Sequence, residues 1–155
     1  MKTPLRILIL CTHNSARSQM LDGRLRQDLA AAGVAAEVWS AGTEKTGVKP
    51  EAVRVMAEVG VDLTDHRSKV LFDLPDPWNF DLVLTVCDAA AASCPTYPAR
   101  TRRLHVGLPD PTGQELAEWR RVRDALGQVS AALVRALLAG RWPEEDELRH
   151  AAGVE

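Results

Sequence analysis

Residues 5–18 read LRILILCTHNSARS, and this stretch joins an apolar run to a short polar loop. The run at residues 5–10 contains one charged residue, which is typical of a strand buried on both faces of a parallel sheet. Apolar side chains then recur at helical spacing until Gly33, and these are Met20, Leu21, Leu25 and Leu29. The stretch therefore predicts a central strand, a tight loop and a helix in direct succession.

The same alternation continues along the chain. Residues 35–39 predict a second strand that ends at Ser40-Ala41-Gly42, and Lys49-Pro50 opens a second helix. Residues 80–87 and 102–106 predict the third and fourth strands, with a partly irregular segment between them. This order favours a single-domain, doubly wound α/β fold with a four-stranded parallel sheet flanked by helices. A ligand of such a fold binds beyond the carboxyl ends of the strands, where Cys11, Ser40, Cys87 and Asp110 are found.

The last part of the chain predicts one long helix and a tail. Thr112 and Glu115 have the spacing of a capping box, and apolar residues then follow one helical face to about Gly140. We therefore expect one folded domain at residues 1–140 and a C-terminal tail at residues 141–155. The acidic residues 144–147 predict solvated surface within that tail.

Composition limits the classes of partner. Of the 155 residues 46% are hydrophobic, and the formal charge of −2 gives no general attraction to nucleic acid or to anionic lipid. The apolar run near the N-terminus is too short for a secretory signal or a membrane span. We expect a cytoplasmic protein that binds neither nucleic acid nor a membrane. In the cytoplasm, cysteines are more often reactive or metal-binding than bridged.

The loop that begins at Cys11 predicts an anion site. Its successive N–H groups and the following helix N-terminus can converge on one anion, and Arg17 can bind two oxygens at once. The predicted oxyanion-binding residues are Thr12, His13, Asn14, Ser15, Ala16, Arg17 and Ser18. The same positive field predicts a lowered pKa for Cys11, which would make this residue a thiolate nucleophile. The alternative interpretation is a buried structural cysteine in a turn.

The pattern Cys-Thr-x-Asn-Ser-x-Arg-Ser directly after a strand resembles the phosphate-binding loop of low-molecular-weight protein tyrosine phosphatases and of the arsenate reductases built on the same fold. Further motifs follow in the family's order over nearly the whole chain, namely Ser40-Ala41-Gly42, Asp65-His66-Arg67-Ser68, Val86-Cys87-Asp88 and Asp110-Pro111. The resemblance implies that the loop is braced by hydrogen bonds from Asn14, Ser18, Ser40 and His66. It also implies that Asp110 is the acid that protonates the leaving oxygen. Without the resemblance, each of these residues is equally a turn or capping residue.

The presence of Cys87 and Cys94 favours a reductase over a phosphatase. A phosphatase needs one cysteine and water, whereas a reductase needs two electrons, which further thiols can supply. The resemblance to thioredoxin-coupled arsenate reductases implies that Cys87 attacks the Cys11 adduct, and that Cys94 then forms a Cys87–Cys94 disulfide. For this relay we expect residues 88–97 to unwind locally. The alternatives are two small buried hydrophobic residues, or a zinc site, for which the cysteine spacing is unsuitable.

The sequence therefore predicts an arsenate reductase that has no bound cofactor or metal, accepts phosphate or sulfate as substrate analogues and takes electrons from reduced thioredoxin. A glutathione-linked electron donor remains an alternative, because the thioredoxin and glutathione systems both act on exposed thiols. The alternative enzyme is a low-molecular-weight tyrosine phosphatase whose extra cysteines protect Cys11. A non-enzymatic oxyanion sensor is a third possibility.

Three observations bear on the mouth of the site and its requirements. Thr112 and Gly113 stand where tyrosine phosphatases of this fold typically place tyrosines, so the mouth suits a small inorganic oxyanion better than a phosphotyrosine. His13 occupies a position often filled by glycine in the family, which bears on access to Cys11. Lys69 stands where some reductases carry an aspartate associated with a monovalent cation, so we do not expect dependence on potassium.

Overall fold

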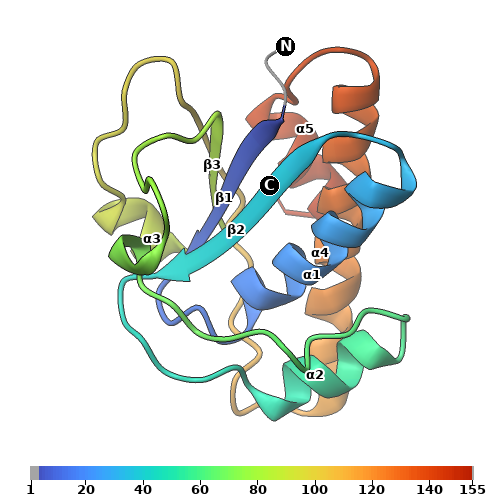
Figure 1. The fold of residues 1–155 in the computed structure, drawn as a ribbon. Coiled ribbons are helices and arrows are strands. Elements are labelled where there is room, and N and C mark those ends of the chain that lie inside the picture. The colour runs from blue at the N-terminus through green and yellow to red at the C-terminus, as the bar shows by residue number, and fades with distance from the viewer. Residues whose placement is uncertain (1–3, 155) are drawn as a thin grey trace.

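The computed structural model describes residues 4–154, and its centre is one four-stranded parallel sheet. The strands are β1 (Leu5–Cys11), β2 (Ala36–Gly42), β3 (Leu82–Thr85) and β4 (Arg102–His105). Their order is β2-β1-β3-β4, and every neighbouring pair is parallel. The predicted doubly wound sheet with a central first strand is therefore confirmed (Figure 1).

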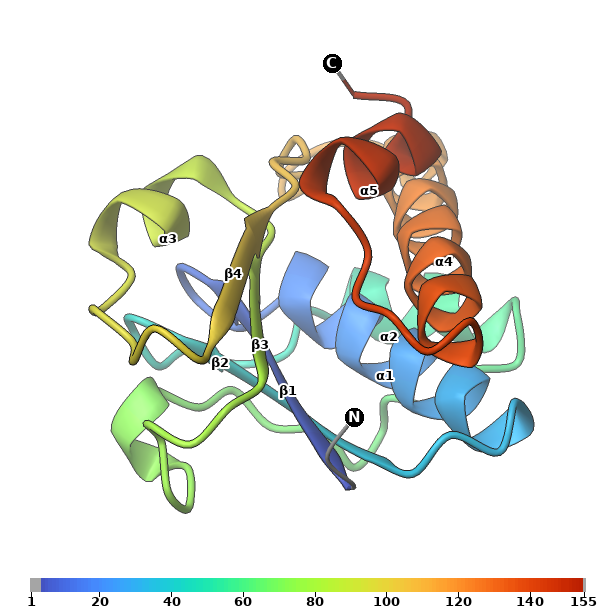
Figure 2. The same ribbon diagram turned by 90° about the horizontal axis from the view of Figure 1, so that it is seen from above.

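Helices cover both faces of this sheet (Figures 1 and 2). The views place α1 (Arg17–Ala31), α2 (Pro50–Ala57) and α4 (Leu116–Leu138) on one side and α3 (Asp88–Ser93) on the other. A single 3₁₀ turn, η1 (Leu71–Asp73), precedes β3, and α5 (Glu145–Ala152) follows α4. Because both faces are covered, β1 is apolar on both sides, and Ile7, Leu8 and Ile9 are fully buried.

The structure of the last part of the chain differs from the prediction in two respects. Helix α4 begins at Leu116 with Glu115 as its N-cap, so Thr112 does not form a capping box. Gly113 has a φ of 81°, and the N–H of Gln114 donates to Pro111 O (2.9 Å), so this segment forms a turn before the helix.

The second correction concerns residues 144–147, which are not only solvated surface. They open α5, and Leu148 of this helix is fully buried in the common core. Leu148, Ala151 and Ala152 recur at helical spacing, which gives α5 an apolar face against α4. Glu145 also accepts a hydrogen bond from the N–H of His105 at the end of β4 (2.7 Å).

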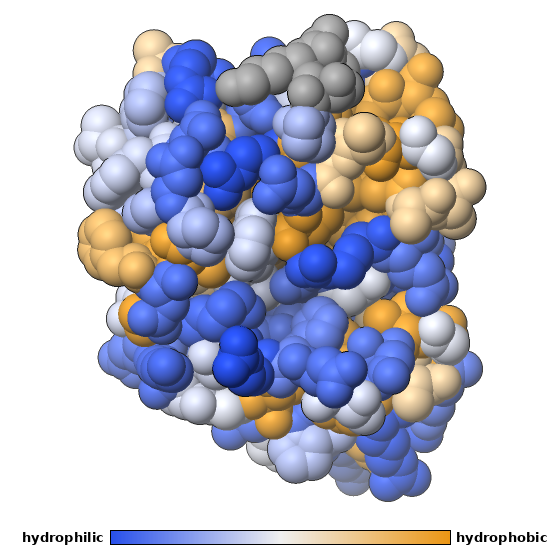
Figure 3. All heavy atoms as spheres, in the orientation of Figure 1, coloured by the Kyte–Doolittle hydropathy of each residue, from blue (hydrophilic) through white to orange (hydrophobic). Residues whose placement is uncertain are grey.

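The carboxyl ends of the parallel strands meet at one edge of the sheet, where the predicted site residues begin. Cys11 ends β1, Cys87 follows β3, and Asp110 follows β4. Figure 3 shows that polar side chains cover most of one face of the molecule, with apolar side chains gathered mainly at its upper right. Within residues 4–154, no helix is long and apolar enough to cross a membrane.

Candidate active site

The loop at residues 12–16 joins β1 to α1 and passes against the end of β2. Gly42, the last residue of β2, makes this approach possible, because a Cβ atom there would lie 2.5 Å from Thr12 O and 2.9 Å from Asn14 N. The N–H of Thr43 then donates to Thr12 O (2.8 Å). The glycine of the Ser40-Ala41-Gly42 motif is therefore the member that contacts the loop.

Asn14 lies at the centre of the loop and is fully buried. Its φ of 50° is in the left-handed region, which asparagine adopts more readily than most residues. Its Nδ2 donates to Ser18 Oγ (3.0 Å), and its Oδ1 accepts from Gln19 Nε2 (2.9 Å) and from the N–H of Lys69 (2.8 Å). One side chain thus ties the loop both to α1 and to the segment before η1. These contacts support the bracing role expected of Asn14 and Ser18.

His66 and Ser40 reach the loop less directly than Asn14 does. His66 Nδ1 lies 2.9 Å from Gln19 Oε1, and Gln19 Nε2 also donates to the backbone oxygen of Asn14 (3.1 Å). Ser40 Oγ donates to Asp22 Oδ2 (2.7 Å), and among the described residues it makes no hydrogen bond to the loop. His66 therefore acts through Gln19, which sequence reasoning does not single out, and Ser40 holds β2 to α1.

Ser68 and Lys69 close the other side of the loop. Ser68 Oγ donates to His13 O (2.8 Å), while Lys69 Nζ donates to Arg67 O (2.8 Å) and lies 3.4 Å from Asn14 Oδ1. Burial lowers the pKa of Lys69. The Lys69 ammonium thus lies beside the asparagine oxygen, and the expectation that potassium is not required stays a prediction.

Several hydrogen-bond donors of the loop lack an acceptor. Among residues 4–154, no carbonyl or side chain accepts from the N–H groups of residues 15–18. Arg17 is 12% exposed; its Nη1 donates to Leu108 O (2.7 Å), but its Nε is buried without a hydrogen-bond partner. Buried donors normally have partners. Converging N–H groups at a helix N-terminus and an unpaired guanidinium nitrogen together suit an oxyanion.

Cys11 and Cys87 lie together beside this loop, and both are 4% exposed. Their side chains share a hydrogen bond. Cys87 is also the N-cap of α3, and its Sγ lies 3.3 Å from Thr12 Oγ1 and accepts from the N–H of Ala90 (3.4 Å). The structure therefore brings two of the three predicted cysteines into direct contact, and both are free thiols.

The predicted lowering of the pKa of Cys11 is wrong for this resting pair. The hydrogen bond with Cys87 raises the pKa of Cys11, and burial adds to this effect, although the charge of Arg17 opposes it. The same hydrogen bond lowers the pKa of Cys87 to about 5, against the effect of burial and with help from the contacts of Thr12 and Ala90. The two sulfurs thus share one negative charge at neutral pH.

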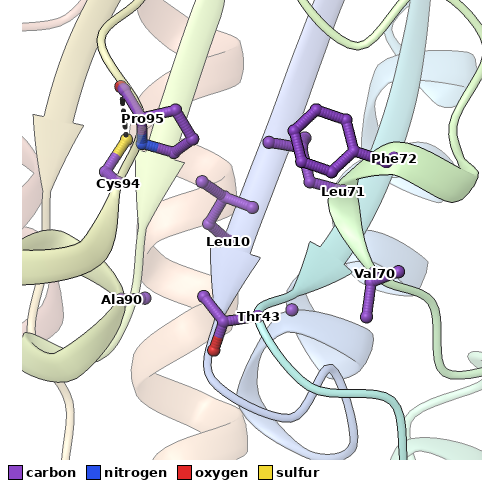
Figure 4. A pocket seen from close by; sticks show the side chains of 9 residues that line it. Leu10, Thr43, Val70, Leu71, Phe72, Ala90, Cys94 and Pro95 are labelled. Carbon is purple, nitrogen blue, oxygen red and sulfur yellow. Dashed lines mark hydrogen bonds between the residues drawn. The ribbon is translucent and has the colours of Figure 1, made fainter.

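Cys94 lies beyond the other end of α3 and is half-buried. It lines an apolar cavity of about 220 Å³. Figure 4 shows Cys94 and Pro95 on one side of this cavity and Leu71 and Phe72 on the other, with Leu10 between them. Burial raises the pKa of Cys94. The third cysteine therefore lies apart from the Cys11–Cys87 pair in the reduced protein.

Asp110 faces the loop across Arg17. Its Oδ2 lies 3.7 Å from Arg17 Nη2, and its side chain is 49% exposed. Burial raises the pKa of Asp110, but hydrogen bonds from Thr112 and the charges of Arg17 and His13 outweigh this effect, so the pKa is lowered. The carboxyl group is therefore ionised at neutral pH in the resting site.

The remaining side chains near the mouth are polar, and the tyrosine is elsewhere. His13 Nε2 lies 3.1 Å from Glu44 Oε2, and both side chains are substantially exposed. Tyr97 is buried and donates its hydroxyl hydrogen bond to Pro77 O (3.0 Å), so it does not face the loop as a stacking platform. Among residues 4–154, no group of three or more His, Cys, Asp or Glu side chains is arranged to hold a metal ion.

Replacing Asn14 with alanine is expected to lower the free energy of unfolding by about 2–4 kcal/mol, because a strained backbone position is retained while buried partners are left unpaired. Urea denaturation measures this change. Asp76→Ala is the matched control, since Asp76 has a φ of 52° but is exposed and outside the loop. Equal losses in the two variants would show that the hydrogen bonds of Asn14 contribute nothing.

Comparisons with known proteins agree with this geometry. The sequence model of the family described as low molecular weight phosphotyrosine protein phosphatase matches residues 6–141. An arsenate reductase of Brevibacillus brevis is 46% identical over 121 residues, which cover 78% of this chain and 87% of that protein.

Two solved structures have the same fold. A structure described as an arsenate reductase in the phosphate binding state is 27% identical with a TM-score of 0.70, and the match covers 84% of this chain and 97% of that one. The low molecular weight protein tyrosine phosphatase from T. tengcongensis is 28% identical with a TM-score of 0.69, and the match covers 88% of this chain and 99% of that one. Proteins described as an arsenate reductase and as a tyrosine phosphatase thus share this fold.

Proposed function

Because this chain belongs to the low molecular weight phosphotyrosine protein phosphatase family and pairs two thiols beside its anion loop, we propose that it reduces arsenate to arsenite. The contact between Cys11 and Cys87 carries this proposal. A phosphatase needs one nucleophile and water, whereas a thiol placed against the nucleophile can take part in electron transfer. The relative at 46% identity bears the name arsenate reductase, which supports the same activity.

The first step is attack by the Cys11 sulfur on arsenic. The loop N–H groups and Arg17 hold the oxyanion, and a proton shift along the hydrogen bond to Cys87 moves the negative charge onto Cys11. A sulfur–arsenic bond forms, and one arsenate oxygen leaves with a proton. Asp110 is the proposed proton donor. When the oxyanion binds the Arg17 guanidinium, its negative charge lies near the Asp110 carboxyl group. This charge raises the pKa of Asp110 in the complex.

The second step joins the two neighbouring sulfurs. Cys87 releases to solvent the proton that it took from Cys11, its thiolate attacks the Cys11 sulfur, the sulfur–arsenic bond breaks, and the electron pair of that bond stays on arsenic. Arsenic is thereby reduced from the +5 to the +3 state, and a Cys11–Cys87 disulfide remains. The short path between these side chains supports this step, because Thr12 and Ala90 already hold Cys87 against the loop.

The third step moves the disulfide to Cys94 and frees Cys11. Cys94 follows Cys87 by seven residues, and at about 1.5 Å per helical residue their Cα atoms lie at least roughly 10 Å apart. A disulfide requires a Cα separation of about 4.4–6.8 Å. Helix α3 must therefore unwind before the bond can form, and the adjoining apolar cavity gives its residues room to move.

We propose reduced thioredoxin as the dithiol that reopens the Cys87–Cys94 disulfide, in the cytoplasm, where thiols are kept reduced. Every side chain assigned a chemical step lies within residues 1–140. Phosphate is the proposed substrate analogue, in keeping with the phosphate-binding state of the related reductase.

Arsenate-dependent oxidation of reduced thioredoxin tests this function. We expect Cys87→Ala to release no arsenite, and Cys94→Ala to release about one equivalent before it stops as the Cys11–Cys87 disulfide. Both variants should lose at least about 100-fold in steady-state turnover. Mass spectrometry after a single turnover without reductant would identify the joined cysteines.

Hydrolysis of an aryl phosphate provides the internal control, because that reaction needs Cys11 but neither Cys87 nor Cys94. Brisk phosphotyrosine turnover that both substitutions leave unchanged, with no thioredoxin oxidation in the unmodified protein, would instead establish a phosphatase with redox-protected Cys11.

A further inference from the structure

Cys94 and Arg103 line one polar cavity on the face of the sheet that α3 covers. This cavity has a volume of about 300 Å³, and its wall includes Thr85, His105 and Glu145. Arg103 and His105 alternate along the edge strand β4 and therefore share one face of the sheet. The Cys94 thiol donates a hydrogen bond to Pro95 O (3.5 Å), and Arg103 lies close enough for its positive charge to act on the Cys94 sulfur.

Cys94 depends more than the other two cysteines on a further positive charge to stabilise its thiolate. The charge of Arg17 favours the thiolate of both Cys11 and Cys87, although other causes raise the pKa of Cys11 overall. Cys87 also has further hydrogen bonds at the start of α3. For Cys94, burial raises the pKa, and the positive charge of Arg103 acts against burial. Only the thiolate form of Cys94 attacks a disulfide, so any group that stabilises its charge speeds the exchange.

We propose that Arg103 is a positioning residue that holds Cys94 as the nucleophile for the second disulfide exchange. This inference rests on the proposed three-cysteine relay. In this step the Cys94 thiolate attacks the Cys87 sulfur, the Cys87–Cys94 bond forms, the Cys11–Cys87 bond breaks, and Cys11 leaves as a thiolate. No net oxidation occurs, and the charge passes from Cys94 back to the loop.

The charge of Arg103 is free for this role. Within the described part of the chain, Arg103 forms no ion pair with a carboxylate. His105 is already held by Thr85 Oγ1 (2.7 Å) and Asp88 Oδ1 (2.8 Å), and Glu145 accepts from the His105 N–H. Arg103 belongs to strand β4 and not to α3, the helix that must unwind.

The other charged and titratable groups around Cys94 do not replace Arg103. Tyr97 is uncharged at neutral pH, since burial and then the charge of Cys94 raise its pKa. Glu145 would oppose a thiolate. Arg102 is the neighbouring residue on β4, is exposed, and alternates to the opposite face of the strand. Arg103 is thus the cation positioned to act on Cys94.

Alkylation of Cys94 over a pH series tests the electrostatic part of the proposal. The full reduced chain is pulsed with iodoacetamide, and the Cys94 peptide is quantified by mass spectrometry. At neutral pH, Arg103→Gln should slow alkylation about threefold, because an exposed charged pair has an effect of this size. The pH profile of Cys94 alkylation in Arg103→Gln should move to higher pH. Arg103→Lys should restore most of the alkylation rate. Arg102→Gln should have the same profile as the unmodified protein. High salt should narrow the difference.

The exchange step is followed separately in a single arsenate turnover without reductant. With Arg103→Gln, the Cys11–Cys87 disulfide should persist about three times longer, and the gap should close at high pH, where Cys94 ionises unaided. Alkylation and exchange profiles that are identical in Arg103→Gln and unmodified protein would overturn the role of Arg103. If the unmodified protein formed no Cys87–Cys94 disulfide, the relay itself would fall, whatever the alkylation profile showed.

Discussion

The Cys11→Ala variant is expected to release no arsenite, with a loss of more than about a thousandfold against the unmodified protein, because the covalent step has no other nucleophile. Cys87 lies within hydrogen-bond distance of Cys11, but it belongs to the start of α3 and not to the loop whose N–H groups face the oxyanion. A coupled thioredoxin assay and a direct arsenite assay measure the loss. Arsenite release from Cys11→Ala would contradict the assignment of the nucleophile.

The same variant also reports on the shared charge. The hydrogen bond from Cys11 is the main cause that lowers the pKa of Cys87 to about 5. In Cys11→Ala this donor is gone, so the pKa of Cys87 should rise. In the unmodified protein the thiolate should therefore disappear as the pH falls through about 5, whereas in the variant it should disappear at a higher pH. Titration of the thiolate absorbance distinguishes the unmodified protein from Cys11→Ala. If the two proteins gave the same titration curve, Cys11 and Cys87 would not share a proton.

Arg17→Lys is expected to lower kcat/KM for arsenate about 100-fold or more, although the charge is kept. The arginine side chain is nearly buried, one nitrogen donates to Leu108 O, and Nε remains to bind the oxyanion. A lysine ammonium cannot hold the carbonyl and two anion oxygens in this planar arrangement. Steady-state assays with arsenate, together with calorimetric titration of phosphate, measure the effect on turnover and on anion affinity.

Arg54→Lys is the control for Arg17→Lys, because Arg54 is exposed on α2 and lies outside the loop. It should leave both kcat/KM and phosphate affinity unchanged. Unaltered phosphate binding in Arg17→Lys would mean that the loop N–H groups hold the anion without the guanidinium.

The sheet and the loop could be predicted because their signals are local. A nearly all-apolar run at residues 5–10, a cysteine at its end and an arginine in the following turn predict a strand, a nucleophile and an anion loop from neighbouring residues alone. The order of the remaining strands follows from the alternation of apolar segments with helical patterns.

The state of the thiol pair could not be predicted, because it depends on a contact between residues 76 positions apart. The sequence places an arginine near Cys11, but it does not reveal that Cys87 lies beside Cys11 and shares its negative charge. The roles of Gln19 and Lys69 are hidden for the same reason. A glutamine in the first turn of a helix has no distinctive pattern, and its three acceptors come from two different segments.

The C-terminal helix was missed for a different reason. Charged residues dominate residues 144–149, and the apolar positions Leu148, Ala151 and Ala152 are too few to indicate a helix before the face of α4 is known. The burial of Leu148 depends on that face, so tertiary packing stabilises what local propensity leaves open.

Helix α3 also has a consequence for storage of the enzyme between encounters with substrate. As long as its six residues remain helical, dissolved oxygen or peroxide cannot join Cys94 to Cys87, because the sulfurs are held at opposite ends of a rigid spacer. Idle protein is thereby kept from forming the Cys87–Cys94 disulfide. Only melting of the spacer removes this restraint.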